Sequence, residues 1–138
     1  MGYTVGDIIA ERTLHLTRES LVRYAGASGD FNPIHYRDDV AAAVGLPGVL
    51  AHGMLTMGLA SSVVLAALPA DVKLIDYGVR FTKPVVVDPD TGADVHVVAK
   101  VGAVDDTSAR IDLTVKYAEN TVLVKAQLRV ALCHGRDH

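Results

Sequence analysis

Residues 52–68 read HGMLTMGLASSVVLAAL, and Pro69 follows them. The stretch contains no proline and stops where one occurs, so it predicts a helix from His52 to Leu68. At about 1.5 Å per residue, this helix is roughly 25 Å long. Its large apolar side chains point in most directions around the axis: Met54, Leu55, Met57, Leu59, Val63, Val64, Leu65 and Leu68. A helix that is apolar nearly all round is typically buried, so other structure is expected to wrap it.

The second half of the chain contains the segments that would wrap this helix. Ala93–Val104, Ile111–Tyr117 and Val122–Val130 alternate apolar and polar residues with a period of two, as half-buried antiparallel strands do. Val72–Thr82 and Ala10–Leu16 are further strand candidates. Two dipeptides between the strands are expected hairpin turns: Asp105-Asp106 and Glu119-Asn120. The pattern predicts an α+β fold in which an antiparallel sheet of four or five strands curls around one central helix.

The first half is helical and loop-like. Thr17 is a good N-cap for a helix that Gly26, Gly29 and Pro33 would break. Residues 28–36 are then expected to form a loop, and Asp38–Val44 is expected to form a short helix.

Length and composition set further bounds. The chain has 138 residues, half of them hydrophobic, and no linker divides it, so residues 1–138 are expected to form one domain. The formal net charge is −3 and no basic run occurs, which argues against nucleic acid as a partner. Residues 49–70 are long enough to span a membrane, but His52, Thr56, Ser61 and Ser62 are unfavourable in lipid, so a buried helix is preferred.

The compartment is inferred from two observations. Cys133 is the only cysteine, which precludes an intrachain disulfide and fits a reducing compartment. We interpret it as a small apolar residue in a terminal strand. Residues 1–11 lack the basic and apolar pattern of a signal peptide, so a cytoplasmic location is expected.

Residues 29–35, GDFNPIH, place a carboxylate, an amide and an imidazole in one short loop. Acid/base chemistry near neutral pH needs groups that take and give a proton, and histidine is suited to this role. Asp30 would orient His35 or hold a water molecule beside it, and Asn32 would support either side chain. The alternative is that Asp30, Asn32 and Pro33 are ordinary turn residues.

A second candidate segment is AHGM, residues 51–54, at the start of the predicted helix. The first N–H groups of a helix have no internal partner, and Gly53 lets a ligand oxygen approach its N–H closely. This favours a site for a developing oxyanion. The alternative is that Gly53 permits close packing and that His52 is a capping or core residue. Ser61 or Ser62 would reach Asp30, or would bond back to the preceding helical turn.

Other chemistries fit poorly. GASG at residues 26–29 lacks the glycine spacing of a nucleophile elbow, and no glycine-rich nucleotide loop occurs. Asp30, His35 and His52 could ligate a metal ion, but the chain has no His-x3-His spacing, and no metal is expected.

Three segments together resemble the MaoC-like, (R)-specific enoyl thioester hydratase family, which has the hot-dog fold. They are AGASGDFNPIH at residues 25–35, AHGMLTMG at 51–58 and YGVRFTKPV at 77–85, so the resemblance covers most of the chain. It implies that residues 1–138 are a single MaoC-like hot-dog domain.

The resemblance also implies roles for individual residues. Asp30 and His35 would be the acid/base pair, supported by Asn32, and the Gly53 N–H would be the oxyanion donor. The family serine that orients the acid falls on Ser61, with Ser62 adjoining it. The candidate substrate contacts are Arg80, Lys83 and His52, of which Arg80 and Lys83 would meet phosphate. The family uses no metal and no organic cofactor.

The implied activity is the reversible hydration of trans-2-enoyl thioesters, the reverse being dehydration of (R)-3-hydroxyacyl thioesters, in fatty-acid or related metabolism. The substrate would be carried on coenzyme A or acyl carrier protein. The family places its acyl tunnel between two subunits, so a homodimer or a heterodimer with a related hot-dog subunit is expected. Two alternatives remain open: a thioesterase on the same fold, and a non-catalytic acyl-binding partner subunit.

Overall fold

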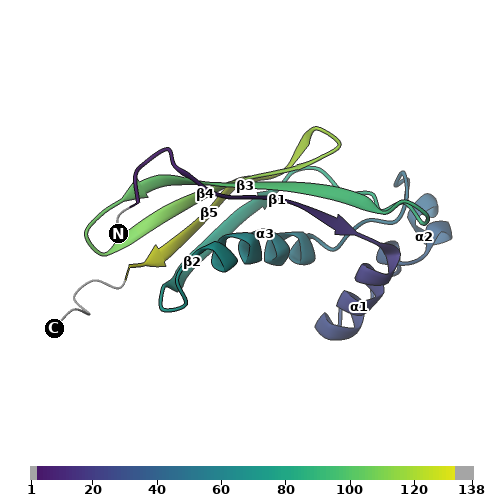
Figure 1. Cartoon of the computed structure of the whole chain (residues 1–138). Coiled ribbons are helices and arrows are strands. Elements are labelled where there is room, and N and C mark those ends of the chain that lie inside the picture. The colour runs from purple at the N-terminus through teal and green to yellow at the C-terminus, as the bar shows by residue number, and fades with distance from the viewer. Residues whose placement is uncertain (1–2, 133–138) are drawn as a thin grey trace.

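The computed structural model describes residues 3–132 and contains one antiparallel sheet with its helices to one side (Figure 1). The elements, in chain order, are β1 (Ile8–Leu16), α1 (Arg18–Ser28), the 3₁₀ helix η1 (Pro33–His35), α2 (Asp38–Ala43), α3 (Gly53–Ala67), β2 (Lys73–Phe81), β3 (Ala93–Val104), β4 (Ser108–Tyr117) and β5 (Asn120–Ala131). The five strands lie in the order β1-β3-β4-β5-β2, and all neighbours are antiparallel. The predicted α+β fold is confirmed, whereas Cys133 lies outside the described residues.

The central helix differs from its prediction in one respect. α3 lies along one face of the sheet, and its residues Thr56, Ala60, Val63 and Val64 are buried there (Figure 1). The opposite side is open, since Met54 is 60% exposed and Leu65 is also exposed. The sheet therefore covers α3 from one side, and the other side of the helix is left exposed. None of the helices in residues 3–132 is both long and apolar enough to cross a membrane.

A tyrosine on the sheet's edge strand fixes α3 to the sheet. Tyr77 of β2 donates a hydrogen bond from its hydroxyl to the main-chain oxygen of Met57, at 2.6 Å. Burial raises the pKa of Tyr77 to about 12, so the hydroxyl keeps its proton and remains a donor at neutral pH.

The strands follow the predicted alternation until β5. Lys125 has a positive φ of 50°, and the pairing shifts there, with Leu113 opposite Ala126 but Val115 opposite Leu123. A second shift follows, with Val115 opposite Leu123 but Lys116 opposite Thr121. Val122 and Leu123 are both buried there, whereas strict alternation would bury only one of them. An extra residue in one strand causes this change of phase, as in a β-bulge.

The hairpin between β4 and β5 turns one residue earlier than expected. Ala118 and Glu119 have φ values of 49° and 67°, and Tyr117 pairs with Asn120 across the turn. Positive φ at both central residues is the geometry that a two-residue hairpin favours, because it matches the twist of the strands.

The first helix begins as predicted but ends later. The Thr17 hydroxyl accepts from the N–H of Ser20 at 3.2 Å, and the Ser20 hydroxyl accepts from the N–H of Thr17 at 3.0 Å. This reciprocal pair satisfies main-chain donors at the start of α1. Gly26 lies inside α1 and does not break it, and the helix ends at Gly29, whose φ is 79°. The short helix α2 forms as predicted, ending at Ala43.

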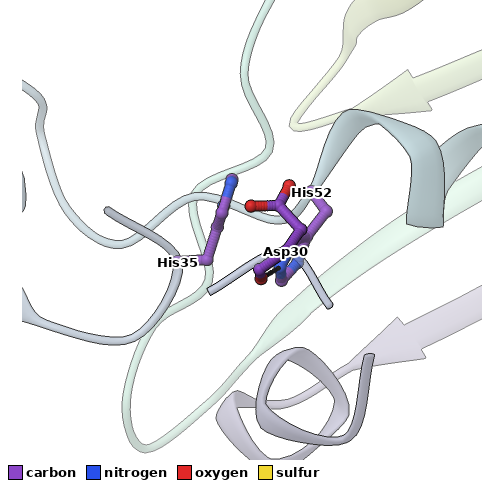
Figure 2. A group of neighbouring side chains, drawn as sticks. All are labelled: Asp30, His35 and His52. Atoms are coloured by element: carbon purple, nitrogen blue, oxygen red, sulfur yellow. Dashed lines mark hydrogen bonds between the residues drawn. The ribbon is translucent and has the colours of Figure 1, made fainter. Parts of the chain in front are cut away.

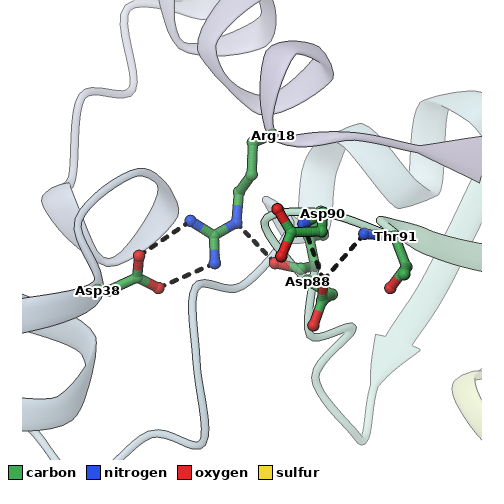
Figure 3. Close-up of polar contacts among 6 residues, drawn as sticks. Arg18, Asp38, Asp88, Asp90 and Thr91 are labelled. Carbon is green, nitrogen blue, oxygen red and sulfur yellow. Dashed lines mark hydrogen bonds and ion pairs between the residues drawn. The ribbon is translucent and has the colours of Figure 1, made fainter.

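Arg18 ties the helical half of the molecule to the loop that precedes β3 (Figure 3). Its guanidinium donates to both carboxylate oxygens of Asp38 at 2.9 and 3.2 Å, and to the main-chain oxygen of Val87 at 2.6 Å. Asp88 accepts from the N–H groups of Thr91 and Asp90, which lowers its pKa below the ordinary value. These bonds fix α1, α2 and the 87–91 loop to one another.

Gly92, which follows the 87–91 loop, is not expected to tolerate a side chain. Its φ is +73°, and a Cβ there would collide with the main-chain oxygen of Leu16. Gly92→Ala should therefore lower the free energy of unfolding by about 3 kcal/mol, from backbone strain and overlap together. Gly45→Ala is the matched control, because Gly45 has a φ of +82° with open space around it. It should lose only about 1 kcal/mol, from the backbone alone. Urea unfolding measures both, and equal losses would contradict the predicted overlap.

Candidate active site

Three side chains that were singled out in the sequence meet at one end of α3 (Figure 2). Asp30 follows the C-cap of α1, His35 ends η1 and His52 is the N-cap of α3. Each offers one potential ligand atom, and these atoms lie within 4.8 Å of one another. Asp30 is exposed, while His35 and His52 are buried.

The loop that carries Asp30 and His35 is built from consecutive side-chain to main-chain hydrogen bonds. The Ser28 hydroxyl accepts from the N–H of Asp30, Asp30 Oδ1 accepts from the N–H of Asn32, and Asn32 Oδ1 accepts from the N–H of Ile34. Asn32 is thus the cap of η1. It supports the pair through the main chain of the loop, and within the described residues its side chain forms no hydrogen bond to the side chain of Asp30 or His35.

A hydrogen bond to the main chain fixes the tautomer of His35. Its Nδ1 lies 2.7 Å from the main-chain oxygen of Leu50. A carbonyl oxygen only accepts, so Nδ1 carries the proton and Nε2 of the neutral ring carries the lone pair. The Asp30 carboxylate is turned toward this imidazole (Figure 2). His35 can therefore accept a proton at Nε2, beside a carboxylate.

His52 lies behind this pair. Its Nε2–H donates to the main-chain oxygen of Asp30 at 3.2 Å, and its ring stacks on His35 with the centroids 3.8 Å apart. The ring is 1% exposed and is absent from the lining of the adjacent pocket, which argues against the predicted contact with substrate. Burial lowers the pKa of His52, so this ring is neutral near pH 7.

A pocket of about 310 Å³ opens beside His35 at the start of α3. Its lining is mainly apolar and includes a few polar groups: His35, Leu50, Ala51, Gly53, Thr56, Phe81, Thr82, Lys83, Pro84, Val85, Val122 and Leu123. Such a combination of apolar walls and a few polar groups is typical of small-molecule sites.

Gly53 lines this pocket, and its main-chain N–H is the candidate oxyanion donor. It is the first residue of α3, and the His52 side chain does not cap the helix. Among the described residues no acceptor takes the Gly53 N–H. A Cβ at Gly53 would lie 2.9 Å from the ring of Phe81, so glycine is also required for packing. Sequence reasoning missed Phe81, whose contact with Gly53 depends on how β2 passes the helix.

The remaining predicted site residues are Ser61, Ser62, Arg80 and Lys83, and of these only Lys83 lines the pocket. The Ser61 hydroxyl donates to the main-chain oxygen of Gly58 at 2.8 Å, and that of Ser62 to Leu59 at 2.6 Å. Both serines thus bond back to the preceding turn, and the structure shows no hydrogen bond from Ser61 to Asp30. Lys83 is exposed at the pocket rim, whereas Arg80 is exposed on β2 and outside the lining.

The three ligand-type side chains do not suit a single metal ion. The rings of His35 and His52 are nearly parallel, with an interplanar angle of 20° and centroids 3.8 Å apart. A metal ion lies in the plane of each imidazole that binds it, and these two planes do not meet within bonding distance of both rings. Nδ1 of His35 and Nε2 of His52 are also occupied by main-chain oxygens.

Comparison with known proteins identifies the family of this chain. Residues 5–122 match the family model described as MaoC like domain. The chain belongs to the MaoC-like family. The match spans both the Asp30–His35 loop and the start of α3, so the family resemblance seen in the sequence is confirmed.

Individual MaoC-like relatives have hydratase or dehydratase names. The chain is 39% identical over 79 residues to 3-hydroxyacyl-thioester dehydratase X of Mycobacterium tuberculosis, covering 57% of this chain and 27% of that protein. It is 29% identical over 118 residues to the (R)-specific enoyl-CoA hydratase of Rhodospirillum rubrum, covering 81% and 82%. The R-hydratase PhaJ1 of Pseudomonas aeruginosa superposes with a TM-score of 0.80 at 28% identity, covering 94% of this chain and 81% of that one.

The MaoC-like chain is short beside some relatives. It covers 27% of the mycobacterial dehydratase and 56% of the mitochondrial 3-hydroxyacyl-[acyl-carrier-protein] dehydratase of Arabidopsis thaliana, to which it is 30% identical over 95 residues and 69% of its own length. The structural likeness to PhaJ1, by contrast, extends over nearly all of this chain. The fold of this chain is accordingly the hot-dog fold.

Proposed function

We propose that this MaoC-like chain catalyses the reversible hydration of trans-2-enoyl thioesters, the reverse being dehydration of (R)-3-hydroxyacyl thioesters. One observation carries the proposal: His35 and the free Gly53 N–H line the same pocket, and the Asp30 carboxylate lies beside His35. A proton-handling pair and an oxyanion donor are the two components that this reaction needs. The names of the Rhodospirillum and Mycobacterium relatives agree with it.

The proposed reaction places a water molecule between Asp30 and His35. The water oxygen forms a bond to C3 of the enoyl group, the C2–C3 π bond opens, and one water proton passes to the acid/base pair. The pair returns a proton to C2, so the elements of water are added across the double bond. His35 is ready for this because its Nε2 lone pair is free while Nδ1 donates to Leu50.

The Gly53 N–H would stabilise the thioester oxygen. As water adds to C3, negative charge moves through C2 to that oxygen, giving an enolate-like species. A main-chain donor at a helix start stabilises such charge, aided by the positive end of the helix dipole. Lys83, which lines the pocket just after β2, would meet a phosphate of the pantetheine carrier, whereas Arg80 lies within β2 and outside the lining.

An absorbance assay tests this proposal. Purified protein is given crotonyl thioesters and longer enoyl thioesters on coenzyme A and on acyl carrier protein, and loss of the conjugated enoyl absorbance is followed. We expect hydration of at least one of them without release of free thiol. Thiol release without hydration would instead indicate a thioesterase. The absence of both reactions with all of these substrates would contradict the proposal.

The edge strand β2 is the surface at which we propose that a second hot-dog subunit binds. Its outer edge is unpaired, and it exposes Leu74, Ile75 and Phe81. β1, at the opposite edge, instead presents two histidine–carboxylate pairs: His15 with Asp94 and His96 with Glu11. Apolar side chains along an open edge favour pairing with another strand.

The active-site pocket reaches the same edge. Phe81 both lines the pocket and ends β2, and the exposed apolar side of α3 adjoins it through Met54, which follows Gly53. A second subunit along β2 would therefore add a wall to the pocket and cover the open side of α3.

A charge on this edge should separate the subunits. Ile75 is 57% exposed on β2, and we expect Ile75→Glu to convert a dimer to monomer and to lower turnover, because a carboxylate cannot be buried unpaired. Val22→Glu is the matched control, since Val22 is 58% exposed on α1. Sedimentation velocity measures the change. An active wild-type monomer, or a dimer that survives Ile75→Glu, would argue against this interface.

A further inference from the structure

His52 contacts both members of the proposed acid/base pair without lining the pocket. Its Nε2–H donates to the main-chain oxygen of Asp30, and its ring stacks on the ring of His35. Tyr24 of α1 meets the same ring edge-on, with the centroids 4.8 Å apart. His52 therefore lies between α1 and the two residues that would handle protons.

The hydrogen bond to Asp30 determines where the proton of His52 lies. Because a main-chain oxygen only accepts, Nε2 carries the proton and Nδ1 carries the lone pair. That Nδ1 is buried, and it has no hydrogen-bond partner among the described residues. An unpartnered buried acceptor costs free energy, so this ring is not explained as a stabilising cap.

A histidine at this N-cap position has a consequence for α3. Serine, threonine, aspartate or asparagine there would accept from the N–H groups of the first turn. The His52 side chain accepts from none of them, which leaves the start of α3 open at Gly53. The same ring fills the space behind His35, which a shorter side chain would not reach.

The stack also limits which ring can carry charge. The titratable groups that face His52 are His35, Asp30 and Tyr24. Burial lowers the pKa of His52, and the nearby His35 lowers it further, against the hydrogen bond to Asp30, which raises it. The ring of His52 thus stays neutral near pH 7, and His35 is the ring of the stack that borders the pocket.

We propose that His52 is a positioning residue: it fixes the ring plane of His35 by stacking and the main chain of Asp30 by its hydrogen bond, and it supplies no proton to the reaction. The inference rests on the proposed hydration, because its effect is expressed through Asp30 and His35. Nδ1 of His35 is bound to Leu50 and one ring face lies against His52, so the ring is held in place where it lines the pocket and Nε2 keeps its lone pair.

Two substitutions of His52 distinguish its stacking on His35 from its hydrogen bond to Asp30. His52→Phe keeps an aromatic face for His35 but loses the donor to Asp30, and His52→Gln keeps an N–H donor but loses the ring. Each should lower kcat about 10- to 100-fold with little change in KM, since a displaced reacting group costs up to about 10²-fold. In a His35→Ala background, His52→Gln should cause little further loss, because it keeps a donor for Asp30 and the ring against which His52 stacks is gone. His96→Phe, the same change on β3 outside the site, should leave kcat unchanged.

NMR of the wild-type chain provides a second readout, which is independent of activity. In ¹⁵N-labelled protein, NMR should show His52 as the Nε2–H tautomer, identified by its loss in His52→Phe or His52→Gln. Its resonances should not titrate in the ordinary histidine range around pH 6.5. A Nδ1–H tautomer, an ordinary titration, or a folded His52→Phe protein with wild-type kcat would overturn the inference.

These outcomes are distinct from failure of the proposed function. A wild-type chain that hydrates no enoyl thioester would remove the proposed function and the positioning role with it, whatever the NMR shows. A wild-type chain that hydrates them while His52→Phe, His52→Gln and the parent share one kcat would remove only the role of His52.

Discussion

Asp30→Asn and His35→Ala are each expected to lower turnover by about 10²- to 10⁴-fold, the usual contribution of general acid–base catalysis. Asp30→Asn removes the charge but keeps an oxygen that can accept from the N–H of Asn32, so the loop should survive. His35→Ala removes the only imidazole that lines the pocket among residues 3–132. Steady-state hydration of the best enoyl thioester gives kcat and KM, and circular dichroism reports folding.

Two controls isolate chemistry from structure. His35→Asn places an amide N–H near the position of Nδ1, so it can keep the bond to Leu50 while lacking the Nε2 base, and it should be as inactive as His35→Ala. Asp39→Asn neutralises an exposed carboxylate of α2 that pairs with Arg37, and it should retain full turnover. A folded Asp30→Asn or His35→Asn protein that hydrates at nearly the wild-type rate would remove the proposed acid/base pair.

Gly53→Pro is expected to lower kcat by about 10²- to 10³-fold, because loss of one oxyanion donor typically costs that much. The loss should fall on kcat more than on KM, since the developing enolate needs the donor more than the ground-state carbonyl does. α3 should still form, because proline suits the first helical position and the extended His52, with φ −61° and ψ 132°, suits a residue that precedes proline.

The Phe81 ring has to be separated from this effect. Any side chain at Gly53 meets that ring at 2.9 Å, so Gly53→Ala measures crowding with the N–H intact. Phe81→Leu relieves the crowding and provides the reference. Adding Gly53→Ala to Phe81→Leu should change kcat little, whereas adding Gly53→Pro should lower it by the full factor. Equal kcat for Phe81→Leu with and without Gly53→Pro would place the thioester oxygen elsewhere.

Local sequence determined much of this protein. Pro69 and the apolar run before it set the limits of α3, and alternation in β3 and β4 predicted both strands, because these signals act between neighbours in the chain. The loop from Asp30 to His35 was also recognisable, since Ser28, Asp30 and Asn32 each bond a main-chain N–H two residues on.

Contacts between distant segments decided the remainder. The bulge at Lys125 arises from pairing with β4 and β2 and reverses the faces of β5, which no local pattern marked. Whether Ser61 or Ser62 could reach Asp30 depended on how α3 and the Asp30 loop pack together, and both serines instead bond back within the helix.

The site shows the same division. The residue types of Asp30, His35 and Gly53 and their places on a loop and a helix start came from the sequence alone. The tertiary structure decided that His52 stacks behind His35, that Phe81 lies against Gly53 and that one side of α3 stays open. Hydrogen bonds from Leu50 to Ile34 and from Ala51 to Val85 bring these segments together. A sequence determines local conformation through neighbouring groups, but the relative placement of segments depends on packing of the whole chain.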